Sequence, residues 1–436
     1  MTNAASAAPS RRQALAGALG LGVSIEFLGR KAFAAAERAA ETRKLIVVIC
    51  RGGMDGLSVS PPVGDPSYAA LRGPIALPGF GSPGGALKLD DTFGLHPALA
   101  SVHQLALKGE ARIAPAVATP DRQRSHFEAQ DVLENGRTTP YATDSGWLNR
   151  ALQAMGPGKV KAMSVGATAP LVLRGPIEAA SWSPGPGVGA DPRLPTILAD
   201  LYAHDPMLSR ALASGLATEA EAKVAGADAK AALTPASAGP ADTMTGMDAQ
   251  ANAGGATLRP VLRQGLPVAR QLGATLAGFM VEPGGPQVAA VSIDGFDTHA
   301  NQGASQGLIA TRLAYLDAML DGVAKGMGAG WKDAAVAVVT EFGRTARVNG
   351  TNGTDHGTAS TALLLGGALK KGGIVGDWPT LSPAKLFENR DTTPTLDMRA
   401  LFKGLLAGQF GIDRRALDTL VFPDSAAAAP TAGLIA

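Results

Sequence analysis

The sequence has little cysteine, few aromatic residues and almost no net charge. Cys50 is the one cysteine in 436 residues, which excludes an intramolecular disulfide, and its place in an apolar run makes it a packing residue rather than a nucleophile. Lysine plus arginine number 39 and aspartate plus glutamate 37, with no basic arm. This balance argues against a protein that binds nucleic acid or another polyanion.

Long hydrophobic runs are also missing, apart from a mildly apolar stretch at the N-terminus. After that stretch, no run reaches the roughly 18 apolar residues of a membrane span, so we expect none. Arg11 and Arg12 precede the apolar run 14–28, and Ala32-Phe33-Ala34 offers the small residues that a signal peptidase reads. We therefore expect residues 1–34 to be a twin-arginine signal peptide that engages the twin-arginine export machinery and directs the protein to the periplasm or the medium. The alternative is a retained, basic amphipathic anchor helix.

From residue 44 onward, short apolar runs alternate with stretches of helical periodicity. Strand-like runs at 45–50, 111–119, 288–293 and 334–339 are separated by helical patterns such as 308–327. This alternation predicts an α/β fold with a doubly wound, mostly parallel sheet and helices on both faces. We expect one domain over 44–424, with a helical cap insertion at about 190–275 and a disordered tail at 425–436.

Polar side chains gather just after four of the predicted strands. They are Asp55 after the first strand, Ser125 and His126 after the second, Asp294, Asp297 and His299 after the third, and Glu341, Arg344, Asp355 and His356 after the fourth. In an open α/β sheet the carboxyl ends of the strands form the ligand-binding edge, so these groups are expected to share one cleft. The alternative is a set of strand-end turns with solvated polar residues.

The chemistry of this set favours a divalent metal. Several carboxylates packed together repel each other unless cations neutralise them, and mixed carboxylate and imidazole ligands suit zinc or manganese better than calcium. We expect one or two ions, with Arg344 gripping a tetrahedral oxyanion through its planar guanidinium. The candidate metal ligands are Asp55, His126, Asp294, Asp297, His299, Glu341, Asp355 and His356.

Ser125 has two interpretations. Ser125-His126-Phe127-Glu128 matches the capping box, in which the serine only caps the following helix. A helix N-terminus also binds anions, and a serine there is placed to attack a bound phosphate with metal assistance. The sequence has no G-x-S-x-G elbow, P-loop, dinucleotide fingerprint or paired C-x-x-C, which removes several common enzyme classes.

Seven motifs, taken in their order, resemble the bacterial family catalogued as domain of unknown function 1501 over nearly the whole mature chain. They are RGGMDGLS, GLHPAL, RSHFEAQD, DGFDTHANQ, TEFGRT, GTDHGT and GDWPTL. That family is similar to the alkaline phosphatase and sulfatase superfamily, whose doubly wound sheet holds two metal ions at the strand ends. The resemblance implies Asp55 as the metal ligand of the first strand and Ser125 at the nucleophile position. The other implied ligands are Asp294 or Asp297 with His299, and His356.

Two departures from that superfamily bear on function. Glu341-Phe342-Gly343-Arg344 stands where an adjacent Asp-His pair is usual, and residues 122–126 lack the proline of the sulfatase signature. We therefore expect an exported, metal-dependent hydrolase of phosphate or sulfate esters, closer to a phosphatase or phosphodiesterase, acting on a small-molecule or polymer ester. The alternative is a non-catalytic exported protein that binds metal or another ligand on the same fold.

Overall fold

The computed structural model describes residues 42–156, 161–166, 169–183, 194–203, 205–224 and 265–436. The predicted signal peptide, residues 1–34, lies outside the described residues. Lys44–Ala436 forms a compact unit built on a mixed sheet of eight strands, in the order β10-β4-β9-β8-β1-β7-β5-β6. Their bounds are β1 Lys44–Cys50, β4 Ala111–Ala118, β5 Ala162–Val165, β6 Ala179–Trp182, β7 Val288–Ile293, β8 Ala334–Val339, β9 Ser360–Leu365 and β10 Leu396–Asp397.

The sheet is mostly parallel, as the alternating pattern predicts. All pairings between neighbouring strands are parallel except the two made by β9, which runs antiparallel to β4 and β8. The central strand β1 is buried along its whole length, which fits its continuous apolar sequence KLIVVIC. Its side chains alternate between two cores, with Ile46 and Val48 on one face and Leu45 and Val47 on the other.

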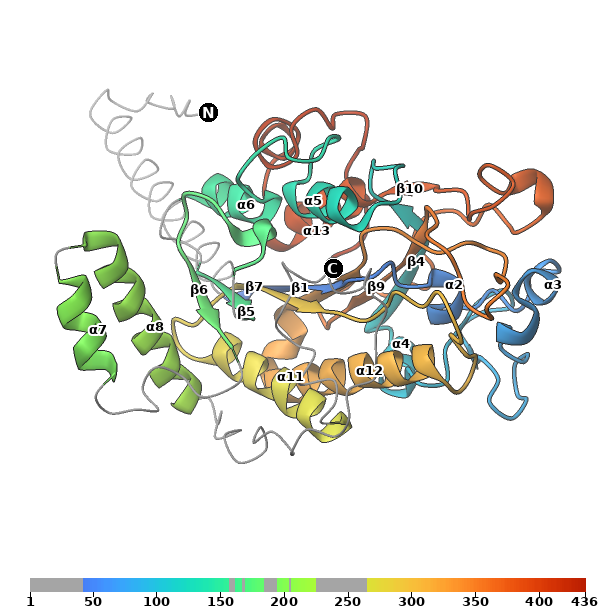
Figure 1. Ribbon diagram of the computed structural model, residues 1–436, viewed down its shortest axis with the longest axis horizontal. Coiled ribbons are helices and arrows are strands. Elements are labelled where there is room, and N and C mark those ends of the chain that lie inside the picture. The colour runs from blue at the N-terminus through green and yellow to red at the C-terminus, as the bar shows by residue number, and fades with distance from the viewer. Residues whose placement is uncertain (1–41, 157–160, 167–168, 184–193, 204, 225–264) are drawn as a thin grey trace, which may run out of the picture. The chain divides into compact units, whose positions relative to one another are not determined.

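Helices cover both faces of the sheet, which confirms the doubly wound arrangement (Figure 1). One layer contains α5 (His126–Asn135), α6 (Trp147–Met155) and α13 (Met398–Phe410). The opposite layer contains α4 (Ala100–Leu107), α11 (Leu266–Val281) and α12 (Leu308–Met327). The smaller elements are α2 Gly56–Val59, α3 Tyr68–Arg72, β2 Leu87–Lys88, β3 Gly94–Leu95 and α14 Arg414–Ala416.

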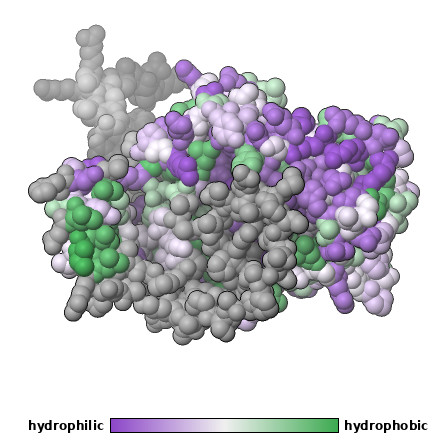
Figure 2. Space-filling view, in the orientation of Figure 1, coloured by the Kyte–Doolittle hydropathy of each residue, from purple (hydrophilic) through white to green (hydrophobic). Residues whose placement is uncertain are grey.

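The range expected to form a cap contains helices of two kinds. Helices α7 (Leu194–Tyr202) and α8 (Pro206–Val224) carry exposed apolar side chains, and Figure 2 shows the apolar surface at α7. Helix α11 belongs instead to the core layer, because a Cβ on its Gly273 would lie 2.0 Å from the Met319 carbonyl oxygen of α12. Such close approach needs glycine, so the end of the expected cap range is part of the core.

The last twelve residues differ from the disordered tail expected from their composition. Leu434 is buried, and the Ala436 amide donates to the Ala368 carbonyl at 2.9 Å. The buried ammonium of Lys403 donates to the carbonyls of Ser425 and Ala428 at 2.7 and 2.9 Å. A buried cation must be satisfied by such acceptors, and this requirement ties the alanine-rich segment to α13.

The register of the central strands brings three strand ends together. Cys50 at the end of β1 lies beside Ile293 at the end of β7, and Ile49 lies beside Val339 at the end of β8. The turns that follow β1, β7 and β8 therefore start at one edge of the sheet. Among the described residues, no helix is both long and apolar enough to cross a membrane.

Candidate metal centre

The glycine turn after β1 allows the turns after β7 and β8 to approach it. Gly52 has φ 111°, and a Cβ at this position would lie 2.5 Å from the Asp297 amide nitrogen. The Gly52 amide donates to Oε1 of Glu341 at 2.8 Å. Backbone this close to backbone, with a positive φ, excludes other residues at Gly52 and sets the separation of the three turns.

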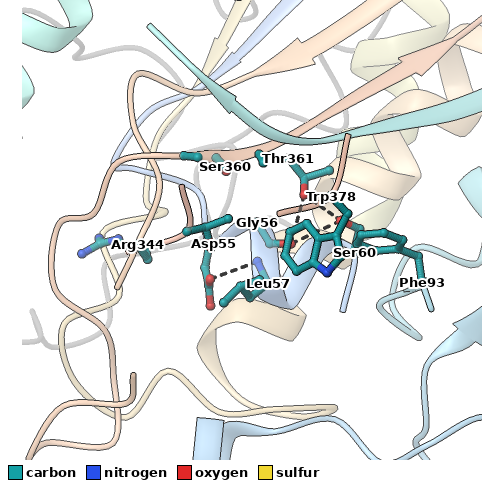
Figure 3. Close-up of a pocket in the computed structure, with 12 residues that line it drawn as sticks. Asp55, Gly56, Leu57, Ser60, Phe93, Arg344, Ser360, Thr361 and Trp378 are labelled. Carbon is teal, nitrogen blue, oxygen red and sulfur yellow. Dashed lines mark hydrogen bonds between the residues drawn. The ribbon is translucent and has the colours of Figure 1, made fainter. Parts of the chain in front are cut away.

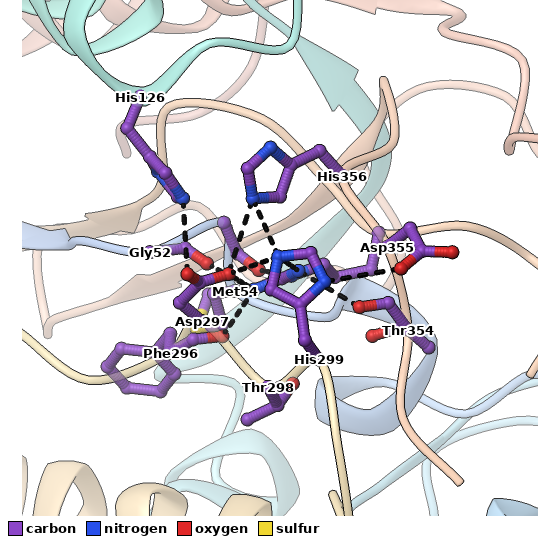
Figure 4. Close-up of polar contacts among 12 residues, drawn as sticks. Gly52, Met54, His126, Phe296, Asp297, Thr298, His299, Thr354, Asp355 and His356 are labelled. Carbon is purple, nitrogen blue, oxygen red and sulfur yellow. Dashed lines mark hydrogen bonds and ion pairs between the residues drawn. The ribbon is translucent and has the colours of Figure 1, made fainter. Parts of the chain in front are cut away.

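Three imidazole rings converge on the carboxylate of Asp297 (Figure 4). Nε2 of His299 lies 3.0 Å from Asp297 Oδ1 and 3.0 Å from Nε2 of His356. Nε2 of His356 lies 3.3 Å from the same Oδ1, and Nε2 of His126 lies 3.5 Å from Asp297 Oδ2. One ligand atom from each of His126, Asp297 and His356 lies within 4.8 Å of the others, so these three side chains could hold a metal ion, and His299 contacts Asp297 beside them.

The other nitrogen of each ring, Nδ1, faces an oxygen that can accept its hydrogen. The three contacts are His126 Nδ1 with Glu341 Oε1 at 2.9 Å, His299 Nδ1 with Asp355 Oδ1 at 3.2 Å, and His356 Nδ1 with the Arg124 carbonyl at 2.8 Å. A neutral ring that donates from Nδ1 presents the Nε2 lone pair to the cluster. Carboxylates and carbonyls in this position are what orients metal-binding histidines.

The electrostatics of the cluster favour bound positive charge. Burial alone would raise the pKa of Asp297, but hydrogen bonds from the three histidines and the charge of Arg344 lower it far below its usual range. Burial lowers the pKa of His126, yet contacts with Asp297 and Glu341 raise it to about 9. Burial raises the pKa of Glu341, and His126 lowers it to about 2. Both carboxylates are therefore ionised at neutral pH.

The raised pKa of His126 predicts that the stability of the metal-free protein depends on pH. Since the folded pKa lies above the ordinary value of 6.5, protonated His126 stabilises the fold fully below pH 6.5, and this stability is lost as the pH rises towards about 9. One pKa unit corresponds to about 1.4 kcal/mol, so the loss is up to about 3 kcal/mol. Denaturant unfolding of chelator-treated protein at about pH 6 and about pH 9.5 measures it. The His126→Gln variant should lack most of this difference, and an equal difference in both proteins would contradict the assignment.

Arg344 is buried and its guanidinium serves the protein itself. Its acceptors are the carbonyls of Gly53 and Gly52 at 2.8 Å each, Thr354 at 3.0 Å and Phe296 at 3.2 Å, together with the Asp297 carboxylate, and Nη1 also lies 3.5 Å from Nε2 of His299. Each of the three nitrogens therefore has an acceptor within the fold. A guanidinium used in this way holds the turns together, and the role expected from the sequence, gripping a substrate oxyanion, stays a prediction.

The family profile described as "Protein of unknown function (DUF1501)" matches residues 42–421. The chain belongs to this family. No curated protein matches it significantly in sequence.

Solved structures similar to this DUF1501 chain include the lipoteichoic acid synthase LtaP from Listeria monocytogenes, with 8% identity, a TM-score of 0.36, and coverage of 88% of this chain and 76% of that chain. Another is the C-terminal periplasmic domain of EcEptC from Escherichia coli in complex with Zn, with 9% identity, a TM-score of 0.32, and coverage of 74% and 72%. At these TM-scores neither likeness carries an argument about activity.

Asp55 and Asp294 of this DUF1501 chain lie apart from the converging ligand atoms. Asp55 is fully buried, caps α2 through the Leu57 amide, and forms an ion pair with Arg72. Asp294 is buried; burial lowers the pKa of Arg51, and the charges of Glu134, Glu341 and Asp294 raise it. Asp55 is therefore paired with an arginine rather than with an imidazole.

Ser125 precedes α5 with extended backbone, φ −98° and ψ 130°, as an N-cap residue does. Its hydroxyl does not accept from a helix amide; it donates to the carboxylate of Glu128. The side-chain half of the predicted capping box is thus replaced by a hydroxyl–carboxylate pair. The hydroxyl–carboxylate pair of Ser125 and Glu128 is compatible with both interpretations of Ser125, the N-cap residue and the nucleophile.

Sequence reasoning missed the carbonyl of Arg124 as a group that orients His356. Arg124 has φ 59°, and Nε of its side chain donates to Asp391 at 3.0 Å. The positive φ belongs to a turn that presents the carbonyl to the ring. A backbone carbonyl has no residue type, so nothing in the sequence marks this role.

A small cavity is lined in part by Asp55 and Arg344 (Figure 3). Phe93 and Trp378 line it together with the hydroxyl pair of Ser60 and Thr361, whose oxygens are 2.6 Å apart. Its volume is enough for about one water molecule. The cavity is therefore too small for an ester substrate.

Proposed function

We propose that this protein is a metal-dependent hydrolase of phosphate or sulfate esters, with one metal ion held by His126, Asp297, His299 and His356. The observation that carries the proposal is the convergence of three Nε2 atoms and a carboxylate while every Nδ1 faces an acceptor. Zinc–nitrogen bonds of about 2.0–2.1 Å in a tetrahedron place the ligand atoms roughly 3.3 Å apart. Four contacts in the cluster, from 3.0 to 3.5 Å, are close to that spacing, and the ligand atoms of His126, Asp297 and His356 all lie within 4.8 Å of one another.

The donor set supports a transition metal. Three imidazole nitrogens and one carboxylate suit zinc, or another borderline ion such as manganese, and suit calcium poorly. A single ion is favoured because the remaining carboxylates already have partners. Glu341 and Asp355 face the far side of the rings, and Asp55 is paired with Arg72.

The residues around the cluster have distinct tasks in this proposal. An ion bound there would lower the pKa of water and polarise an ester oxygen. His299 and Asp355 are the more exposed members, so substrate approaches on their side. Glu128 already accepts the Ser125 hydroxyl hydrogen, which makes it the base for that proton if Ser125 attacks the ester.

The test combines metal analysis with Ser125 variants. The purified protein should contain close to one equivalent of zinc or manganese and should hydrolyse an activated phosphomonoester or diester. If Ser125 is the nucleophile, Ser125→Ala and Ser125→Asp should both lower kcat at least about a thousandfold while metal content stays unchanged. If Ser125 takes no part in the chemistry, Ser125→Ala should lose only its hydrogen bond to Glu128, at a cost of about 1 kcal/mol of stability, and turnover should stay intact.

A non-catalytic exported binding protein is the second candidate. The contacts of the buried Arg344 favour this second candidate. Its guanidinium donates to backbone carbonyls of the fold, so it is not available to bind a substrate oxyanion. In this case the protein binds the same metal, but metal-replete wild type hydrolyses neither phosphate nor sulfate esters. Absence of metal from the purified and reloaded protein would count against both candidates.

We also propose that residues 1–34 direct export through the twin-arginine pathway to the periplasm or the medium. The support is Arg11 and Arg12 ahead of a mildly apolar run. Replacing both with lysine should leave folded precursor in the cytoplasm, as measured by fractionation and immunoblotting. An unchanged yield of exported protein from that variant argues for another route or for a retained anchor.

A further inference from the structure

Gln302 lies at the centre of a buried network beneath the histidine cluster. It is fully buried, and its Nε2 donates to Asp55 Oδ2 at 2.6 Å. Its Oε1 accepts from the hydroxyls of Thr298 and Thr354 at 2.7 Å each. A carboxylate can only accept, so the amide nitrogen must face Asp55 and the carbonyl must face the two threonines. The orientation of Gln302 is therefore determined by its partners.

Both threonines belong to the turns that carry metal-ligand candidates. Thr298 directly precedes His299, and Thr354 comes two residues before His356. Both threonines are fully buried, and the Thr354 amide donates to the Thr298 carbonyl at 3.1 Å. One glutamine oxygen thus joins two turns that lie more than fifty residues apart in the chain.

On its other side the network is anchored at the end of β1. Asp55 accepts from the Ser58 hydroxyl at 2.7 Å and is paired with Arg72. Arg72 also donates to the Thr345 carbonyl at 3.3 Å. Because Asp55 cannot move without breaking this ion pair, it offers Gln302 a fixed point at the central strand.

We propose that Gln302, held by Asp55, is a positioning residue that sets the separation between His299 and His356. The inference rests on the metal site proposed above. The Nδ1 contacts to Asp355 and the Arg124 carbonyl determine how each ring is rotated. Gln302 acts on the backbone instead, and metal sites need their ligands within about 0.5 Å of the right place.

The test compares Gln302→Leu with Gln409→Leu. Gln409 is equally buried and also joins two segments, since its Nε2 donates to the carbonyls of Lys44 and Asp333 at 2.9 and 2.6 Å. Those carbonyls lie at the amino ends of β1 and β8, opposite the histidine cluster. Both variants should lower Tm. Only Gln302→Leu should weaken cobalt(II) binding, by about 10–100-fold, and change the visible absorption spectrum of the bound ion.

Thr354→Val provides a milder variant that keeps the side-chain shape and removes one hydroxyl. It should weaken cobalt(II) binding in the same direction but less, and it should add little in the Gln302→Leu background because both changes break one contact. If Gln302→Leu does not fold, Thr354→Val measured against Gln409→Leu decides the question.

The outcomes separate the two ideas. If wild type binds neither cobalt nor zinc, the metal site itself is wrong. If wild type binds cobalt, and the Gln302→Leu or Thr354→Val protein binds it with unchanged affinity and spectrum, only the positioning role of Gln302 is overturned.

Discussion

Asp297→Asn should remove metal from the protein and destabilise the fold at the same time. The carboxylate faces all three histidines and is also the anionic partner of Arg344, a fully buried side chain. Its neutral amide would leave that cation without a counter-charge, which we expect to cost about 3 kcal/mol. Metal content by mass spectrometry and the free energy of unfolding by denaturant titration measure the two effects.

The matched control is Asp355→Asn. Asp355 contacts only His299 among the three rings and is half exposed, so it orients a ligand without contacting the proposed ion. We expect metal affinity to fall by about 10–100-fold and the protein to remain nearly as stable as wild type. If Asp297→Asn retained metal as well as Asp355→Asn does, Asp297 would not be a ligand.

Arg72→Met should be among the most destabilising single changes in this chain. The ion pair of Arg72 and Asp55 is inaccessible to solvent on both sides, and removing one partner of such a pair typically costs about 3–5 kcal/mol. Replacing Asp55 as well with leucine should recover part of the loss, because no buried charge is then left alone. The free energies of unfolding of the single and double variants form the measurement.

The control for this pair is Lys88→Met. Lys88 and Asp91 form an ion pair at 2.8 Å, but both side chains are exposed. Exposed pairs contribute about 0–1 kcal/mol, so the change should be small. If Arg72→Met lowered the free energy of unfolding as little as Lys88→Met does, the buried ion pair of Arg72 and Asp55 would contribute little to stability.

The apolar patterns predicted the elements of the fold closely. The strand expected at 334–339 and the helix at 308–327 have the same bounds in the structure. These segments are buried along a regular period, and burial is what a pattern of apolar residues records. The antiparallel direction of β9 and the core position of α11 could not be predicted, because they depend on which neighbour each segment meets.

The sequence predicted where the candidate site lies better than it predicted what each of its residues does. Strand ends gave the residues that the structure brings together, among them His126, Asp297, His299 and His356. Whether a carboxylate faces a ring nitrogen or a guanidinium depends on contacts across the fold, as Arg72 beside Asp55 illustrates. The type of residue alone does not carry that information.

The position of β1 has a consequence for how the protein folds. Leu45 pairs with Val288 of β7 and Lys44 with Ala334 of β8. The first strand of the sheet therefore has no pairing partner until these two strands have been synthesised. Closing such long loops is entropically costly and slows folding. A buried strand left without neighbours for that time is prone to aggregate. We therefore expect the nascent chain to need protection by chaperones, and the histidine cluster to assemble only after His356 has left the ribosome.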